Sequence, residues 1–251
     1  PDDAAREAAE IVEEMGEDGP RLLDASTAHR VAEGWVYGFA ELAPGQAEAI
    51  ASARMVSNPG CYPTGGIALL RPLVDAGILP ADHPVSLNAV SGYSGGGKSM
   101  IEAYESGKAP AFELYGLGLE HKHLAELQTY SRLARRPIFV PSVGNFRQGM
   151  LVCVPLHLDA LPGRPRVADL EKALSDRYQG CEWVRFVAGE DSALKSGRIE
   201  PEAHNDTNVM ELRVFGGEAR RQAVLVARLD NLGKGASGAA VQNLKLMLGL
   251  D

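Results

Sequence analysis

The stretch "SNPGCYPTGG", Ser57–Gly66, places a cysteine between a Pro-Gly turn and the start of a helical pattern. Pro59 and Gly60 predict the turn, and "TGGIALLRPLVDAGI" predicts a helix that Gly77 closes. Cys61 would then lie close to a helix N-terminus, where backbone amides stabilise an anion and lower the pKa of a thiol. A core cysteine is the alternative, because cysteine is among the most buried residue types, but a core position needs no such turn. The stretch therefore favours a nucleophilic thiol.

The segments before Cys61 alternate between helical and strand-like patterns. "PDDAAREAAEIVEEMGEDGP" and "GQAEAIASAR" predict helices, whereas "RLLDAST" and "MVSNPG" predict short buried strands of a parallel sheet. This alternation indicates an α/β fold, with part of a Rossmann-like parallel sheet over residues 1–60. Asp24, Ser26 and Thr27 follow the first strand, at the carboxyl end where the sites of α/β proteins form.

The strand-like runs become longer after Pro80. They are "PVSLNAVSGYS", "PIFVPSVG", "GMLVCVPLHLDAL", "CEWVRFVA", "NVMELRVFG" and "RQAVLVARLDN", and helical patterns at "HLAELQTYSRLA" and "VADLEKALSDRY" interrupt them. We expect an α+β catalytic and dimerisation domain over residues 61–234, with a mixed, largely antiparallel sheet. The closing "GASGAAVQNLKLMLGL" predicts a helix within residues 235–251 that returns to the first domain.

With 251 residues, 45% of them apolar, and a net charge of −8, the chain has the composition of a globular protein. The acidic balance argues against nucleic acid as a partner, since phosphate contacts need a surplus of Lys and Arg. No apolar run approaches the roughly 20 residues that cross a bilayer, so we expect no membrane partner and a cytoplasmic protein. Cys61, Cys153 and Cys181 lie far apart in sequence, which indicates free thiols rather than disulfides or a CxxC metal site.

A nucleophilic thiol needs a partner for proton transfer, and "LEHKHLAELQ" contains two histidines. His121 and His123 open a helical pattern, and Glu126 at i+3 could orient His123, which is our first choice for the acid/base residue. A single histidine is more often a surface or core residue, but a pair next to an acidic residue favours catalysis. An HxH pair can also bind a metal ion, yet the sequence lacks further ligands at the usual spacing, so we predict no metal.

Two glycine-rich stretches are candidates for ligand binding. "VSGYSGGGKSM", Val90–Met100, has three consecutive glycines between a strand and Lys98, which would let backbone amides approach a phosphate-bearing ligand. A flexible loop is the alternative, and the stretch is not a Walker motif. "DNLGKGASGAA", Asp230–Ala240, puts Lys234 in front of a helix, where phosphate or ribose could dock.

Taken together and in this order, "DASTAHR", "SNPGCYPT", "VSGYSGGGK", "HKH" and "DNLGKGASGAAVQN" resemble the N-acetyl-gamma-glutamyl-phosphate reductase family in its shorter, bacterial form. The resemblance runs from Pro1 to the C-terminus. It implies reduction of N-acetyl-L-glutamyl 5-phosphate by NADPH to N-acetyl-L-glutamate 5-semialdehyde and phosphate, in arginine biosynthesis. The family resembles the aspartate-semialdehyde and glyceraldehyde-phosphate dehydrogenases in mechanism, since a cysteine thioester accepts hydride where a carboxylate would not.

The resemblance also implies roles for residues of these motifs. Cys61 would form the thioester, and His123, with His121 near it, would protonate and deprotonate the thiohemiacetal oxygen. The substrate would contact Asn58, Arg30, Glu126 and Arg147, the last as a clamp for its carboxylate. NADPH would contact Ser26, Thr27, Ser91, Gly92, Ser94, Gly95, Gly96, Lys98, Asn231 and Lys234. The long strands after Pro80 suit a sheet-mediated homo-oligomer, a homodimer or a homotetramer.

Full-length members of the family begin with a strand and a glycine-rich turn that hold the pyrophosphate, and this unit is not found before the first predicted helix. We therefore expect the chain as written to bind NADPH weakly or not at all, unless these residues exist and are only left out of the sequence. The alternative functions are another phosphate-dependent semialdehyde dehydrogenase, of the aspartate or aminoadipate type, a cysteine-protease-like hydrolase, or an inactive fragment that only oligomerises.

Overall fold

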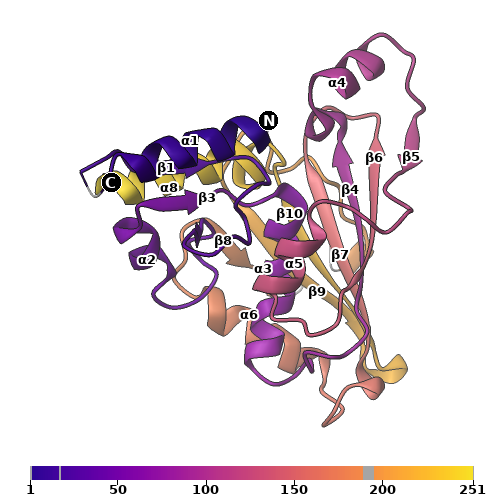
Figure 1. The fold of residues 1–251 in the computed structure, drawn as a ribbon. Helices are drawn as coiled ribbons and strands as arrows, with labels where there is room; N and C mark the ends of the chain where they lie inside the picture. Colours follow the sequence, from indigo (N-terminus) through magenta and orange to yellow (C-terminus); the bar gives the residue numbers. More distant parts are fainter. Residues whose placement is uncertain (1, 17, 189–194, 251) are drawn as a thin grey trace.

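Two β-sheets joined by a long buried helix organise the chain (Figure 1). The computed structural model describes residues 2–16, 18–188 and 195–250. The helices are α1 (Asp2–Glu14), α2 (Gln46–Ser52), α3 (Cys61–Asp75), α4 (Gly97–Glu105), α5 (Leu124–Tyr130), α6 (Val167–Tyr178) and α8 (Gly238–Leu248), with the short turns η1 (Tyr93–Gly96), η2 (Leu158–Ala160), η3 (Glu218–Arg220) and η4 (Gly233–Ser237). Within this described part of the chain, no helix has both the length and the apolar character needed to cross a membrane.

The smaller sheet contains the strands that precede Cys61. It consists of β1 (Leu22–Asp24), β2 (Val36–Tyr37) and β3 (Met55–Ser57), in the order β1-β3-β2 with all pairs parallel. The parallel sheet expected from the βαβα pattern is therefore confirmed. β2 was not predicted, because a strand of two residues is too short to show a periodic pattern.

The larger sheet is mixed and largely antiparallel, as expected. Its strands are β4 (Ser86–Gly92), β5 (Phe112–Leu114), β6 (Ile138–Gly144), β7 (Met150–His157), β8 (Val184–Phe186), β9 (Met210–Gly217) and β10 (Gln222–Leu229), in the order β5-β6-β4-β7-β10-β9-β8. The pairs β4–β6 and β8–β9 are parallel, and the other pairs are antiparallel.

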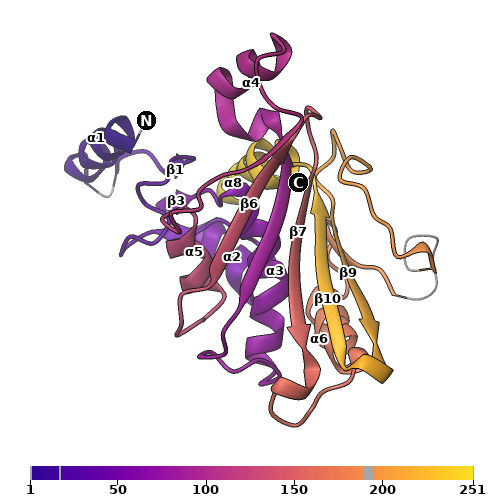
Figure 2. The ribbon, with the colours of Figure 1, turned by 90° about the vertical axis from the view of Figure 1, so that its right-hand side faces the viewer.

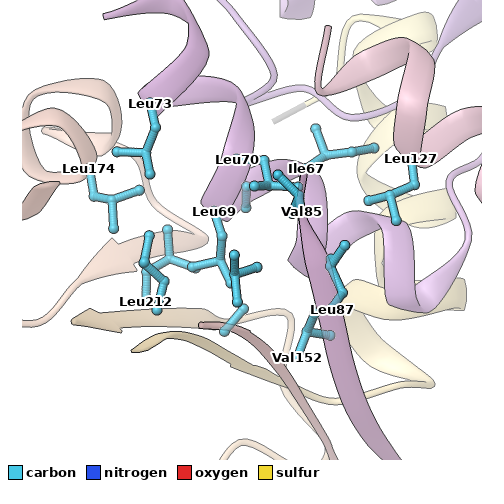
Figure 3. Close-up of a cluster of buried hydrophobic side chains, with 14 of the residues drawn as sticks. Ile67, Leu69, Leu70, Leu73, Val85, Leu87, Leu127, Val152, Leu174 and Leu212 are labelled. Carbon is cyan, nitrogen blue, oxygen red and sulfur yellow. The ribbon is translucent and has the colours of Figure 1, made fainter. Parts of the chain in front are cut away.

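Helix α3 forms the centre of the core. It packs on β7 and β10 and against α5 and α6, and Figure 3 shows its apolar side chains meeting those of α5, α6 and strands of the larger sheet. The two glycines of its first turns allow this close packing: a Cβ on Gly65 would lie 2.9 Å from the Val152 side chain, and one on Gly66 would lie 2.7 Å from Leu127. The start of α3, at Cys61, is thus followed by turns of helix that pack closely in the core.

The C-terminal helix α8 returns to the smaller sheet, as the sequence predicted. It packs against α2 and β1 (Figure 1). Its Asn243 donates hydrogen bonds to the Gly38 carbonyl at 2.8 Å and to the Asn58 side chain at 3.1 Å, so the last helix also supports the turn before Cys61. The domain limits at residues 60 and 234 stay a prediction.

Candidate active site

Cys61 is the first residue of α3, so the helix begins three residues earlier than the pattern from Thr64 predicted. Gly60 precedes it in an extended conformation, with φ −75° and ψ 151°, and has no side chain to cap the free amides of the first turn. Hydrogen bonding from the backbone amides of Tyr62 and of Cys61 itself acts to lower the pKa of the thiol. The predicted placement of the thiol at a helix N-terminus is confirmed.

The expected lowered pKa of Cys61 is wrong. Burial raises the pKa of the thiol to about 11, and the nearby Glu126 carboxylate adds to the rise, whereas the backbone amides and Arg30 offset only part of it. The helix N-terminus stabilises the thiolate only through the partial charges of the amides in its first turn. Burial, in contrast, removes the hydration of the full negative charge, so its effect on the pKa is larger. Cys61 is therefore a neutral thiol at pH 7 and needs a base to become a nucleophile.

Glu126 lies 1% exposed beside Cys61, and three donors hold its carboxylate. Arg30 donates to Oε1 at 2.7 Å, while Tyr37 at 2.7 Å and the Gly60 amide at 3.0 Å donate to Oε2. Burial raises the pKa of Glu126 and these three donors act in the opposite direction. Three donors to the two oxygens suit an ionised carboxylate, which only accepts hydrogen bonds, so Glu126 is ionised in this arrangement. The predicted role of Glu126 in orienting His123 is wrong, because other groups hold both oxygens.

His121 and His123 lie next to this cluster. Their ring centroids are 4.7 Å apart, and the His123 amide donates to His121 Nδ1 at 3.2 Å. A Cβ on Gly60 would lie 2.7 Å from His123 Nε2, which places this nitrogen beside the residue that precedes Cys61. Burial lowers the pKa of His123 well below its usual value, and the charges of His121 and Arg30 add to the effect. His123 is therefore a neutral imidazole at pH 7, able to accept a proton.

The glycine-rich stretch after β4 meets the C-terminal motif, although more than 130 residues separate them in sequence. Asn231 donates to Ser94 Oγ at 2.9 Å and accepts a hydrogen bond from the Gly149 amide at 2.8 Å. A Cβ on Gly95 would lie 2.9 Å from Ser91 Oγ, and one on Gly92 would lie 2.5 Å from the Arg147 carbonyl oxygen. The structure thus brings together five of the predicted cofactor residues: Ser91, Gly92, Ser94, Gly95 and Asn231.

Other predicted residues have protein partners that account for them. Lys234, which is 1% exposed, forms an ion pair with Glu41 at 2.8 Å and donates to Gln242 at 2.6 Å, so its ammonium is held by side chains outside the glycine-rich stretch. Asn58 donates to the Ala236 carbonyl and accepts from Asn243. The predicted ligand contacts of Lys234 and Asn58 are therefore corrected to internal structural roles.

The remaining predicted residues lie at the edges of the site. Ser26 and Thr27 follow β1 as expected, but their hydroxyls donate to Asp24 and Asp2. Lys98, on α4, is exposed and lies 3.8 Å from Glu102, and Gly96 is the last residue of η1. The flexible loop considered for this stretch is instead the helical turn η1 followed by α4. Arg147 is exposed and lies on the turn between β6 and β7. Its carbonyl oxygen accepts a hydrogen bond from the backbone amide of Ser94.

Four tyrosines complete the site, and sequence reasoning missed three of them. Tyr62, inside the cysteine motif, donates to the Ser142 carbonyl, and Tyr115 donates to the Tyr62 hydroxyl at 2.9 Å. Tyr37 and Tyr130 stack on each other with ring centroids 3.7 Å apart. Tyr37, Tyr115 and Tyr130 belong to none of the quoted motifs. Tyr62 could be found from the sequence because it directly follows Cys61 in the cysteine motif.

A cavity of about 1070 Å³ lies elsewhere, between α2, α8 and the turns that contain Cys181 and Asn208. Its lining includes Gly233 and Ser237 of η4, whereas Gly235 of the same turn faces Cys61, where a Cβ would lie 2.9 Å from the cysteine Cβ. Neither Cys61 nor His123 lines the cavity, so the candidate catalytic residues lie outside it.

Comparisons with known proteins agree with this arrangement. A family model described as "Semialdehyde dehydrogenase, dimerisation domain" matches residues 61–231. N-acetyl-gamma-glutamyl-phosphate reductase of Chelativorans sp. (strain BNC1) is 57% identical over 252 residues, which cover 99% of this chain and 80% of the relative. The protein of the same name from Brucella ovis is 57% identical over 254 residues, which cover 99% of this chain and 81% of the relative.

Solved structures show the same fold at low sequence identity. Aspartate semialdehyde dehydrogenase II from Vibrio cholerae superposes with a TM-score of 0.71 at 17% identity, covering 98% of this chain and 77% of that one. Aspartate semialdehyde dehydrogenase from Francisella tularensis superposes with a TM-score of 0.70 at 13% identity, covering 97% and 78%. The likeness to these enzymes is a likeness of fold.

Proposed function

The chain belongs to the N-acetyl-gamma-glutamyl-phosphate reductase family, and we propose on this premise that it is an oxidoreductase that converts N-acetyl-L-glutamyl 5-phosphate to N-acetyl-L-glutamate 5-semialdehyde and phosphate. The observation that carries the proposal is the position of Cys61 at the start of α3, with neutral His123 beside Gly60. Such a reaction belongs to arginine biosynthesis.

The first chemical step uses groups that lie together in the site. His123 accepts the proton of the Cys61 thiol, and Sγ attacks the acyl carbon of the substrate. The bond from this carbon to the phosphate oxygen breaks, phosphate leaves with the electron pair, and a thioester forms on Cys61. The Arg30 guanidinium, which lowers the pKa of Cys61, stabilises the thiolate during attack.

The second step returns the enzyme to its first state. NADPH, when bound, supplies the hydride that adds to the thioester carbon. Protonated His123 gives its proton to the resulting oxygen, and it removes that proton again as the carbon–sulfur bond breaks and the semialdehyde leaves. His123 then returns the proton to the Cys61 thiolate, which restores the neutral thiol and the neutral imidazole. The thiolate of Cys61 is a good leaving group, which is why a thioester suits this reduction.

We assign the cofactor to the cradle formed by Ser91, Gly92, Ser94, Gly95 and Asn231. The assignment is supported by the exposed backbone of this stretch, because Gly95 and Gly96 are exposed in η1 and carry no side chain that would cover their amides. Arg147, exposed on the turn beside Ser94, is assigned to the substrate carboxylate. The preference for NADPH over NADH stays a prediction.

The test of this function is the reverse reaction, phosphate-dependent oxidation of a semialdehyde by the full-length protein. We expect N-acetyl-L-glutamate 5-semialdehyde to be oxidised with a kcat/KM at least about a hundredfold above that of aspartate semialdehyde, because the acyl pocket must accept the acetamido group. Oxidation is expected to stop when phosphate is omitted. A preference for aspartate or aminoadipate semialdehyde would contradict the substrate, and turnover without phosphate would contradict the acyl phosphate.

We propose further that the chain forms a homodimer or homotetramer through the face of the larger sheet opposite α3. Figure 2 looks onto this face, which no helix in the described part of the chain covers. Ile138 and Val224 point from it and are 54% and 38% exposed, while their neighbours Phe139 and Leu225 point into the core. We expect Ile138→Glu to lower the mass measured by sedimentation equilibrium, whereas Ile11→Glu, at an equally exposed site on α1, leaves it unchanged. A monomeric parent protein would contradict this interface.

A further inference from the structure

Tyr37 and Tyr130 form a stacked pair behind the active site. Tyr37 ends β2 of the smaller sheet and Tyr130 ends α5, so the pair joins the two parts of the molecule. The rings lie 3.7 Å apart and within 13° of parallel, and Tyr37 is 2% exposed. A buried tyrosine needs a partner for its hydroxyl, and both hydroxyls here find one in the network around Cys61.

The two hydroxyls hold the two members of one ion pair. Tyr37 donates to Glu126 Oε2 at 2.7 Å, and Tyr130 donates to the carbonyl of Arg30 at 2.6 Å. Arg30 in turn donates to Glu126 Oε1 at 2.7 Å and to the carbonyl of Asn58 at 3.0 Å. The stacked pair thus holds Glu126 and Arg30 through these two hydrogen bonds.

Gly60 connects Glu126 to Cys61, because it binds the carboxylate through its amide and directly precedes the cysteine. Its Oε2 accepts both the Tyr37 hydroxyl and the Gly60 amide, and Gly60 is the residue from which α3 begins. Space around Gly60 is minimal, since a Cβ there would lie 2.6 Å from Arg30, 2.6 Å from Glu126 and 2.7 Å from His123. A shift of the carboxylate would strain or break its hydrogen bond from the Gly60 amide.

We propose that Tyr37 is a positioning residue for the Cys61 thiol. Its hydroxyl keeps the Glu126 carboxylate in hydrogen-bond contact with the Gly60 amide, and its donated hydrogen bond partly neutralises the carboxylate charge near the sulfur. This proposal rests on the proposed function in taking Cys61 as the nucleophile. Tyr37 touches neither Cys61 nor a substrate. It acts through Glu126, from a strand outside the cysteine motif.

Ionisable groups from several elements face Cys61, and they set the direction of the expected effect. They are Arg30 from the segment after β1, Tyr62 on α3, Tyr115 after β5 and Glu126 on α5, while His123 before α5 lies beside Gly60. Glu126 raises the pKa of Cys61 and Arg30 lowers it. Loss of the Tyr37 donor leaves more of the carboxylate charge to act on the thiolate, so the thiol becomes harder to ionise.

The experiment measures alkylation of Cys61 by iodoacetamide against pH, with each cysteine quantified by mass spectrometry. Tyr37→Phe is expected to raise the alkylation midpoint of Cys61 and to slow its alkylation at neutral pH by about 3- to 10-fold, with Cys153 unchanged. Tyr178→Phe is the matched control, because Tyr178 is also buried and loses a single bond, to the Ala68 carbonyl. An unchanged or lowered midpoint in Tyr37→Phe would overturn the proposal.

A double-mutant cycle separates an effect through Glu126 from a general loss of packing. Glu126→Gln removes the charge and is expected to lower the Cys61 midpoint, opposite to Tyr37→Phe. The double variant is expected to match Glu126→Gln alone, and a further rise on adding Tyr37→Phe would refute the route through Glu126. Alkylation needs no substrate, so these outcomes are separate from failure of the proposed function, which full activity of a Cys61→Ser variant would reveal.

Discussion

Replacement of Cys61 by serine is expected to slow acylation of this residue by N-acetyl-L-glutamyl 5-phosphate by about a thousandfold or more. A serine hydroxyl is much harder to ionise than a thiol, and His123, whose pKa burial lowers well below its usual value, is too weak a base to compensate. The measurements are the burst of phosphate release and the mass of the intact protein, which should show an added N-acetylglutamyl group on the parent protein only. The free energy of unfolding should change by less than about 1 kcal/mol, because serine is close to cysteine in shape.

The other two cysteines provide matched controls for this substitution. Cys153 lies on β7, where burial raises its pKa to about 11, and burial also raises the pKa of Cys181. Neither lies at a helix N-terminus, so Cys153→Ser and Cys181→Ser should leave the burst intact. An acyl group on Cys153 or Cys181, or a burst that survives in Cys61→Ser, would disprove the assignment of the nucleophile.

Gly60→Ala is expected to destabilise the protein by crowding the cluster of side chains next to Cys61. The backbone of Gly60 is acceptable for alanine, with φ −75° and ψ 151°, so the cause is crowding and not strain. The new Cβ would lie 2.6–2.7 Å from Arg30, Glu126 and His123, and it would force apart a buried ion pair. We expect the free energy of unfolding to fall by about 2–4 kcal/mol, and alkylation of Cys61 to change its pH dependence.

Gly217→Ala is the matched control for Gly60→Ala. Among the described residues, no atom outside its immediate neighbourhood lies within 4 Å of where its Cβ would be, and its φ of −137° suits any residue. Urea unfolding should place Gly217→Ala within about 0.5 kcal/mol of the parent protein. If Gly60→Ala proved as mild as this control, the crowded cluster around Gly60 would not exist in solution.

Much of the fold was predictable because its signals are local. The alternation of strand and helix patterns before Cys61 predicted the parallel sheet, and the Pro-Gly turn predicted a helix start beside the thiol. The two strands that were missed, β2 and β5, contain two and three residues, too few for any periodicity. The sequence predicted a ligand site at the glycine-rich stretch, which stays a prediction, but it did not predict the helical turn η1 or the pairing of Ser94 with Asn231.

The assignments that failed depended on partners distant in sequence. Glu126 was expected to orient His123, its neighbour at i+3, but it binds Tyr37, which lies 89 residues away, and Arg30, which lies 96 away. Lys234 was expected at the cofactor, but its ammonium pairs with Glu41, 193 residues away. A hydrogen-bonding group takes whichever partner the packed chain brings to it, and no local pattern encodes that choice.

The sequence by itself determined where the reactive sulfur lies, because turn residues and hydrophobic periodicity act over a few residues and place Cys61 at the start of α3. Only the tertiary structure decided how the sulfur is held and how readily it ionises. Desolvation and charge at Cys61 come from α5, the segment after β1 and the smaller sheet, which meet only when the whole chain packs. The pKa of the thiol is therefore a property of the fold, whereas its position is a property of the motif.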